Sequence, residues 1–284
     1  MERSLVSPEF VKKLAQWRNR HKERWAKALL SSPIQTTMRR IVRPEGVLLI
    51  MGSRRSGKTG LAMEIMDDFH DRKNIPGAVC YPQEHKKLKK LLPRWVKVVT
   101  RLKDLPPNSI CVVDEASQVA HARRTSSGAA VDLDALVAIS EQKHQLIIFI
   151  THHSRKFDIN DVHGSDMIIW KMPTLADTMW EREELQMYVL RAWEFFEALP
   201  HARESGKFSL QQLKACYVMN LKRMEFYTFK NGLPKWWTNE LSTVFKLFED
   251  LDPNGKGAVK AKEVEAKVVK RKKKSRKKEA KKKR

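Results

Sequence analysis

The chain contains few cysteines and no long apolar stretch. Its 284 residues include three cysteines, Cys80, Cys111 and Cys216, with no C-x-x-C spacing among them. This argues against a disulfide framework and indicates a reducing compartment. No apolar run approaches the roughly 20 residues that a membrane helix needs, and the charged stretch after Met1 does not resemble a signal peptide. We therefore expect a soluble, cytoplasmic protein that is not inserted in a membrane.

Acidic residues are scarce at both ends of the chain. The net charge is +23, but residues 1–44 hold 11 basic and 3 acidic residues, and residues 256–284 hold 16 and 3. The remaining residues carry only +2. This pattern predicts a nearly neutral body with basic arms that touch an anionic partner, and a tail over 256–284 that is disordered when free.

A phosphate-binding pattern follows the first strongly apolar run. Val47–Met51 leads directly into Gly52–Thr59, GSRRSGKT, which fits G-x-x-x-x-G-K-[ST]. In this pattern backbone N–H groups surround a polyphosphate, Lys58 reaches the β- and γ-phosphates, and the Thr59 hydroxyl holds Mg²⁺. The helix that begins near Thr59 adds its positive end. We therefore predict a site for ATP and Mg²⁺ formed by Gly52, Ser53, Arg54, Arg55, Ser56, Gly57, Lys58, Thr59 and Gly60.

Two carboxylates end a later apolar strand. Asp114 and Glu115 follow Ser109–Val113, about 55 residues after the phosphate loop. A carboxylate in this position can hold the Mg²⁺ water shell, which we assign to Asp114. The second can orient and deprotonate an attacking water, which we assign to Glu115. A kinase has no need of the second carboxylate, so the pair predicts hydrolysis.

Other polar residues are candidates for sensing the γ-phosphate or completing the site. Leu146–Ile150 is followed by Thr151, His152 and His153, of which we assign His152 as the γ-phosphate sensor and His153 to the loop. Arginines on two loops are candidates for completing the site of a neighbouring subunit. Solvated loop cations or DNA contacts are the alternative for these arginines, which are Arg123, Arg124 and Arg155. The predicted catalytic set is Glu115, Lys58, His152, Arg124 and Arg155.

Buried strands alternate with helices through the middle of the chain. Continuous apolar strands separated by helices predict an α/β fold with a mostly parallel sheet and helices on both faces. After Pro173 a long helix over 176–199, two strands and a helix over 238–250 predict a small α+β appendage. The predicted divisions are a basic helical arm over 1–44, an ATPase core over 45–173, the appendage over 174–255 and the tail over 256–284.

The stretches GSRRSGKT, ICVVDEAS and LIIFITHHSRKFDINDVHGSDMIIW resemble the FtsK–HerA superfamily of P-loop ATPases over roughly residues 45–172. Viral genome-packaging ATPases are the most similar members, and zonula occludens toxin-like phage proteins are more distant. Lys58 and Thr59 match the family's Walker A residues, and Asp114 and Glu115 its Walker B pair. The chain departs from the family at His152, where glutamine is usual, and at Arg54, where threonine is common.

The resemblance implies a function and partners. It implies ATP hydrolysis coupled to the movement of double-stranded DNA through a homo-oligomeric ring, typically a hexamer. A viral chain would act in the host cytoplasm or at the virion, with a capsid or portal protein as a further partner. Two alternatives stay open: an ATPase for virion assembly or extrusion, and a nucleic-acid-binding protein that uses ATP only as a switch.

One further pattern has a second interpretation. Residues 252–263 mimic a calcium-binding loop, with Asp252 at its first position and Glu263 at its twelfth. Lys256 stands at the fifth position, where an oxygen ligand belongs, and the loop leads into the basic tail. A turn that ends the preceding helix is therefore our preferred interpretation.

Overall fold

The computed structural model describes residues 32–81, 86–114, 140–152, 164–202, 207–223 and 225–249. Several predicted features lie outside these residues. They are the helix of the N-terminal arm, Glu115, Arg123, Arg124, His153, Arg155, residues 252–263 and the basic tail. Their assignments stay predictions.

A nine-stranded sheet, in the order β1-β9-β8-β7-β2-β6-β5-β3-β4, forms the centre of the larger unit. Every neighbouring pair from β7 to β4 is parallel. The strands of this parallel part are β2 (Gly46–Gly52), β3 (Gly77–Cys80), β4 (Val96–Val99), β5 (Ile110–Val113), β6 (Leu146–Ile150) and β7 (Met167–Lys171). All except β4 are buried along their whole length, as expected for strands with both faces covered. The predicted mostly parallel α/β fold is confirmed.

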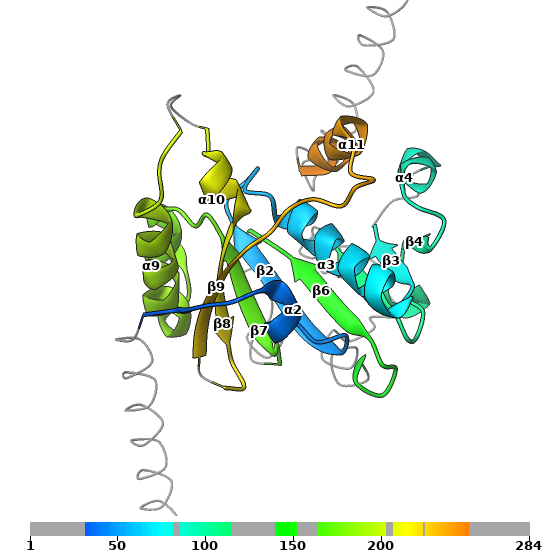
Figure 1. The fold of residues 1–284 in the computed structure, drawn as a ribbon, viewed down its shortest axis with the longest axis horizontal. Coiled ribbons are helices and arrows are strands. Elements are labelled where there is room, and N and C mark those ends of the chain that lie inside the picture. Colours follow the sequence, from blue (N-terminus) through cyan, green and yellow to red (C-terminus); the bar gives the residue numbers. More distant parts are fainter. Residues whose placement is uncertain are drawn as a thin grey trace, which may run out of the picture. The chain divides into compact units, whose positions relative to one another are not determined.

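Helices cover both faces of this sheet. Side chains alternate along β2, so Val47, Leu49 and Met51 face one way and share a buried apolar cluster with α9 (Glu183–Glu197). Leu48 and Ile50 point to the opposite face, where α3 (Lys58–Lys73) contacts the sheet. Figure 1 shows α3 running along β2 and β6. The covered faces fix the position of the loop that joins β2 to α3.

The sheet continues beyond the predicted boundary at residue 173. β8 (Ala215–Asn220) pairs antiparallel with β7, and β9 (Glu225–Lys230) pairs antiparallel with β8. The two strands predicted after Pro173 are therefore an extension of the core sheet. The N-terminal arm contributes β1 (Ile34–Gln35), which pairs parallel with β9, and the short helix α2 (Met38–Ile41). The short helices α10 (Leu210–Lys214) and η1 (Leu102–Asp104) complete the larger unit.

The prediction of a single helix over 176–199 is wrong, because the chain forms two helices there. α8 (Leu175–Trp180) begins with a capping box between Thr174 and Asp177, and α9 starts anew at Glu183. Glu181 is extended, with ψ of 166°, and is buried. Its carboxylate accepts a hydrogen bond from the backbone N–H of Arg182 at 3.0 Å. This local bond replaces the helical path that apolar periodicity alone would continue.

A smaller unit holds the two remaining described helices, α4 (Lys86–Leu91) and α11 (Asn239–Glu249), which contact each other. Within it Trp237 stacks on Phe245 of α11, with ring centroids 5.8 Å apart. Among the described residues of both units, no helix combines the length and the apolar character that crossing a membrane requires.

Candidate nucleotide-binding site

The sheet order brings three strand ends together. β6 lies between β2 and β5, and all three are parallel, so their carboxyl ends meet at one edge. The loop after β2 contains the phosphate-binding pattern, β5 is followed by Asp114, and β6 by Thr151 and His152. Residues distant in sequence thus converge where ligands bind in open α/β sheets.

The backbone of the loop requires glycine at two positions. A Cβ on Gly52 would lie 1.8 Å from the carbonyl oxygen of Lys171, so no side chain fits where β2 passes the end of β7. Gly57 has a φ of 90°, which L side chains rarely adopt, and it immediately precedes α3. Ser53 ties the loop to β7, because its hydroxyl donates to the Met172 carbonyl at 2.6 Å.

Lys58 is buried at the start of α3 and points back into the loop. Its Nζ donates to the carbonyls of Gly52 at 3.1 Å and Ser53 at 2.8 Å. It also lies 3.2 Å from Nδ1 of His152, which is itself 3.2 Å from the Gly52 carbonyl. Since one nitrogen cannot accept from Lys58 and donate to Gly52 at once, the tautomer decides which contact is a hydrogen bond. The predicted lysine and the predicted sensor are therefore direct neighbours.

The residues predicted to hold Mg²⁺ are also in contact. The Thr59 hydroxyl donates to Oδ2 of Asp114 at 3.2 Å. A hydroxyl and a carboxylate are the hard oxygen ligands that Mg²⁺ takes, with phosphate oxygens and water completing its shell. Across the segments that the structure describes, no group of three His, Cys, Asp or Glu side chains forms a closed metal site. The two oxygens fit an ion that arrives with a nucleotide.

Ser56 gives a second sign that the loop is built for a ligand. Its side chain is fully buried, and its hydroxyl has no hydrogen-bond partner. A buried hydroxyl without a partner is costly, and a phosphate oxygen in the loop would satisfy it. Arg54 and Arg55, by contrast, are exposed, and Arg55 has an unusual φ of 63°.

Sequence reasoning missed a buried lysine beneath the loop. Lys171 ends β7 and is completely buried, and its Nζ donates to the carbonyls of Leu213 at 2.5 Å and Ala215 at 2.8 Å. It also donates to Oδ1 of Asn231 at 2.6 Å. Its Cε lies 3.7 Å from the position that a Cβ on Gly57 would take. The only sequence signal was a lysine at the end of an apolar strand, a position that usually reaches solvent.

This lysine belongs to a polar cluster that connects the loop helix to β8 and β9. Burial lowers the pKa of Lys171 and raises the pKa of the Cys216 thiol beside it to about 11. Glu64 of α3 accepts two hydrogen bonds from the N–H of Gly232, at 2.9 and 2.8 Å, just after β9. Burial raises the pKa of Glu64 despite these bonds. The cluster therefore joins the end of β7, the start of β8 and the end of β9 to the phosphate loop.

Comparisons with known proteins find solved structures that are similar to this chain. No protein-family model and no curated protein sequence matches it. The genome-packaging NTPase B204 of Sulfolobus turreted icosahedral virus 2, in complex with AMPPCP, is 12% identical, with a TM-score of 0.44 over 67% of this chain and 100% of that one. B204 of Sulfolobus turreted icosahedral virus, a DNA-packaging ATPase, is 12% identical, with a TM-score of 0.46 over 68% and 100%. The N-terminal domain of zonular occludens toxin from Neisseria meningitidis is 14% identical, with a TM-score of 0.34 over 68% and 96%.

Both groups named in the sequence resemblance are therefore among the similar structures. Identity at this level does not transfer a ligand or a partner to this chain. The P-loop NTPase fold rests on the chain's own sheet order and phosphate loop.

Proposed function

We propose that this chain is an ATP-hydrolysing motor that moves double-stranded DNA during the packaging of a viral or mobile-element genome. The observation that carries the nucleotide part is the convergence of Lys58, Thr59, Asp114 and His152 at one edge of the sheet. The DNA part rests on the basic ends of an otherwise nearly neutral chain.

Each residue has a distinct task in this proposal. Lys58 turns from the carbonyls of Gly52 and Ser53 to the β- and γ-phosphates, and Ser56 donates its unpartnered hydroxyl to a phosphate oxygen. Thr59 and Asp114 hold Mg²⁺, which neutralises charge on the phosphates. Glu115, next after Asp114, orients and deprotonates the attacking water.

His152 links the γ-phosphate to the protein. While Nζ of Lys58 donates to the Gly52 carbonyl, Nδ1 of His152 lies within hydrogen-bond distance of both that nitrogen and that carbonyl. Movement of Lys58 toward phosphate leaves His152 to donate either to that carbonyl or to the phosphate. Arg124 or Arg155 of a neighbouring subunit would complete the site in a ring, for which a hexamer is the proposed form.

The test is hydrolysis measured with and without duplex DNA. We expect DNA to stimulate the wild-type protein, and Glu115→Gln to bind ATP while hydrolysing it about 10² to 10⁴ times more slowly. Asp104→Asn is the matched control, since Asp104 lies in η1 and its ion pair among the described residues is with the exposed Arg101. Hydrolysis that ignores DNA in ring and monomer fractions alike would rule out the motor.

A second candidate is a non-motor protein that coats nucleic acid and uses ATP as a switch. The charge of residues 256–284, 16 basic against 3 acidic, favours it because such a segment binds nucleic acid without any motor. A protein of this kind needs no ring and no stimulation of hydrolysis by DNA.

A further inference from the structure

The chain that leaves β9 lies against the first turn of α3. A Cβ added to Gly60 would be 2.6 Å from Cδ2 of Leu233, so this leucine packs directly on a glycine that is distant in sequence. Figure 1 shows the chain passing from β9 toward the start of α3. Gly60 immediately follows Lys58 and Thr59 of the candidate site. Leu233 is therefore a neighbour of the phosphate loop.

Hydrogen bonds from the residues before it hold Leu233 in this position. The N–H of Gly232 donates to both carboxylate oxygens of Glu64 on α3, at 2.9 and 2.8 Å. Oδ1 of Asn231 accepts a hydrogen bond from the buried ammonium of Lys171 at 2.6 Å. These bonds do not involve the leucine side chain, so the backbone at Leu233 keeps its place when that side chain is shortened.

The side chain of Leu233 is nevertheless exposed to solvent. Its exposed fraction is 57%, whereas Pro234 after it is buried. Single exposed leucines are common on protein surfaces and need no explanation by themselves. This leucine differs because its backbone is anchored to α3 and because it lies beside a loop built for phosphate. A flat ring resting on it would remove apolar surface of both groups from water.

The order of the strands gives the direction in which a nucleotide would lie across this turn of α3. Thr59 contacts Asp114 after β5, on one side of β2. Gly60, the next residue, contacts Leu233 after β9, on the other side of β2. The N–H groups in this first turn have no acceptor inside the helix and fit phosphate oxygens. Since Mg²⁺ and the γ-phosphate belong on the Asp114 side, the base at the other end of the nucleotide extends toward Leu233.

We propose that Leu233 packs against the base of the bound nucleotide and forms the apolar contact of the ATP site. Ligand sites combine such apolar surface with a few polar groups that fix orientation, which here are those of the phosphate loop. A leucine side chain has no hydrogen-bonding group, so it contacts the face of the ring and does not by itself distinguish adenine from guanine. This inference rests on the nucleotide part of the proposed function and is independent of DNA movement.

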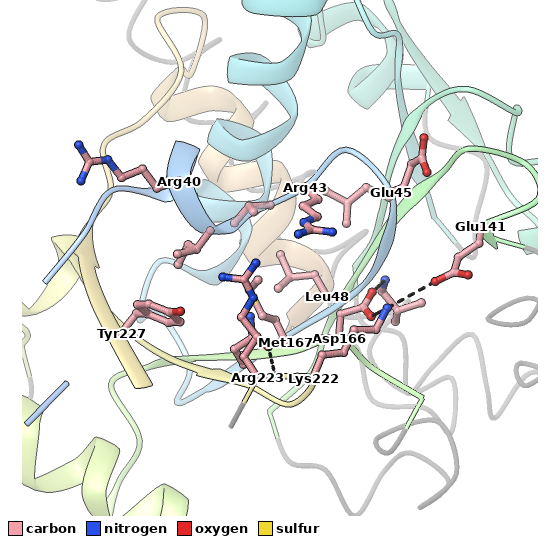
Figure 2. Close-up of a pocket in the computed structure, with 15 residues that line it drawn as sticks. Arg40, Arg43, Glu45, Leu48, Glu141, Asp166, Met167, Lys222, Arg223 and Tyr227 are labelled. Carbon is pink, nitrogen blue, oxygen red and sulfur yellow. Dashed lines mark hydrogen bonds and ion pairs between the residues drawn. The ribbon is translucent and has the colours of Figure 1, made fainter. Parts of the chain in front are cut away.

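A cavity at the other end of β2 is too remote to receive this base. It has a volume of about 540 Å³ and is lined by the first residues of β2, β6 and β7. Figure 2 shows its acidic side chains engaged by Lys222, which pairs with Asp166 and, at 3.4 Å, with Glu141. β2 has seven residues, and at about 3.3 Å per residue it separates the cavity from the phosphate loop by about 20 Å.

The test compares three ligands by calorimetry in the presence of Mg²⁺. They are AMPPCP, which is an analogue of ATP, ribose 5-triphosphate, which lacks the base, and inorganic tripolyphosphate, which lacks base and sugar. Each is titrated into the full chain as wild type, Leu233→Ala, Leu233→Met and Met187→Ala. Met187 is the matched control, because it is exposed over 54% and belongs to α9, on the face of the sheet opposite α3. Thermal melting verifies folding.

We expect Leu233→Ala to bind AMPPCP roughly five- to twentyfold more weakly and the other two ligands as wild type does. Leu233→Met should recover most of the affinity, and Met187→Ala should show no loss. Unchanged AMPPCP affinity in Leu233→Ala, or an equal loss for all three ligands or for ribose 5-triphosphate, overturns the base contact. A wild-type chain that binds none of the ligands overturns the nucleotide site as well. Hydrolysis that ignores DNA overturns the motor alone.

Discussion

At the scale of single residues, Lys171 is a completely buried lysine whose ammonium lies among backbone carbonyls. Its ammonium donates to two carbonyls, the Asn231 side chain and the Cys216 sulfur, and no carboxylate of the described residues accepts a hydrogen bond from it. The cost of burying it is reflected in its lowered pKa. Lys171 lies against Gly52 and Gly57 of the phosphate loop. We infer that burying its ammonium, although costly, helps to hold this loop in place.

We predict that Lys171→Met destabilises the protein by about 2–4 kcal/mol and weakens ATP binding. The carbonyls of Leu213 and Ala215 and the Asn231 oxygen lose their donor in a buried site, and an unsatisfied buried acceptor is costly. Urea unfolding and nucleotide titration measure the two effects. Lys214→Met, the same change at an exposed neighbour, is the control, and equal stability of both variants would contradict the prediction.

The residues of the site differ in how far the sequence revealed them. The proximity of Lys58, Thr59 and Asp114 was predictable because each belongs to a local pattern with a fixed relation to a strand end. Lys171 was not, because its burial depends on β8, which begins 44 residues later and pairs antiparallel with β7. Ser56 was predictable as part of the loop, but its buried, unpartnered hydroxyl was not.

At the scale of elements, one carboxylate joins two helices. Asp68 of α3 accepts a hydrogen bond from Nε of Arg39 on α2 at 2.6 Å and from Nε of Arg72, one turn further along α3, at 2.8 Å. Burial alone would raise the pKa of Asp68, but the two arginines hold it below its usual value. The N-terminal arm is thereby anchored to the helix that follows the phosphate loop.

We predict that Asp68→Asn lowers the free energy of unfolding by about 1–2 kcal/mol at neutral pH. Because the folded pKa is depressed, this contribution is fully present above the unfolded pKa of about 3.9 and is lost as pH falls through the folded value. Chemical unfolding from pH 7 to pH 3 should show the gap between wild type and variant closing below about pH 4. Asp71→Asn, exposed on the same helix, is the control, and a gap independent of pH would disprove the linkage.

The helices and strands also differ in how well the sequence predicted them. Continuous apolar runs correctly indicated the buried parallel strands, because such runs need cover on both faces. The break between α8 and α9 was missed, since the buried Glu181 carboxylate and the Thr174 cap act locally against an apolar pattern that favours one helix. The division at residue 173 followed a change in composition, which does not reveal that β8 and β9 extend the same sheet.

At the scale of the whole molecule, the distribution of charge along the chain provides a way to distinguish the two candidate functions. Most of the net charge of +23 lies in the terminal segments, whereas the residues between them carry only +2. A motor that contacts DNA through its core keeps binding sites after the tail is removed. A coating protein that depends on the tail does not.

We predict that deleting residues 256–284 weakens DNA binding and reduces its salt dependence, but leaves binding that requires ATP. The tail supplies 16 basic residues, so its loss removes much of the nonspecific attraction. A chain carrying the tail in reversed sequence is the control, and it should restore affinity if charge alone matters. Complete loss of DNA binding on deletion would favour the coating protein over the motor.

The two outer strands of the described sheet bear on how copies of this chain can associate. On one side the outermost described strand is β1, with only two residues, and on the other it is β4, whose Lys97 is exposed. Short or lysine-bearing edges offer little backbone for another strand to join. Joining sheets edge to edge is therefore disfavoured, which protects a nine-stranded sheet from aggregation during folding. In the proposed ring, subunits would therefore meet through side chains. Such contacts can slide or loosen with each cycle of ATP hydrolysis without breaking a ladder of backbone hydrogen bonds.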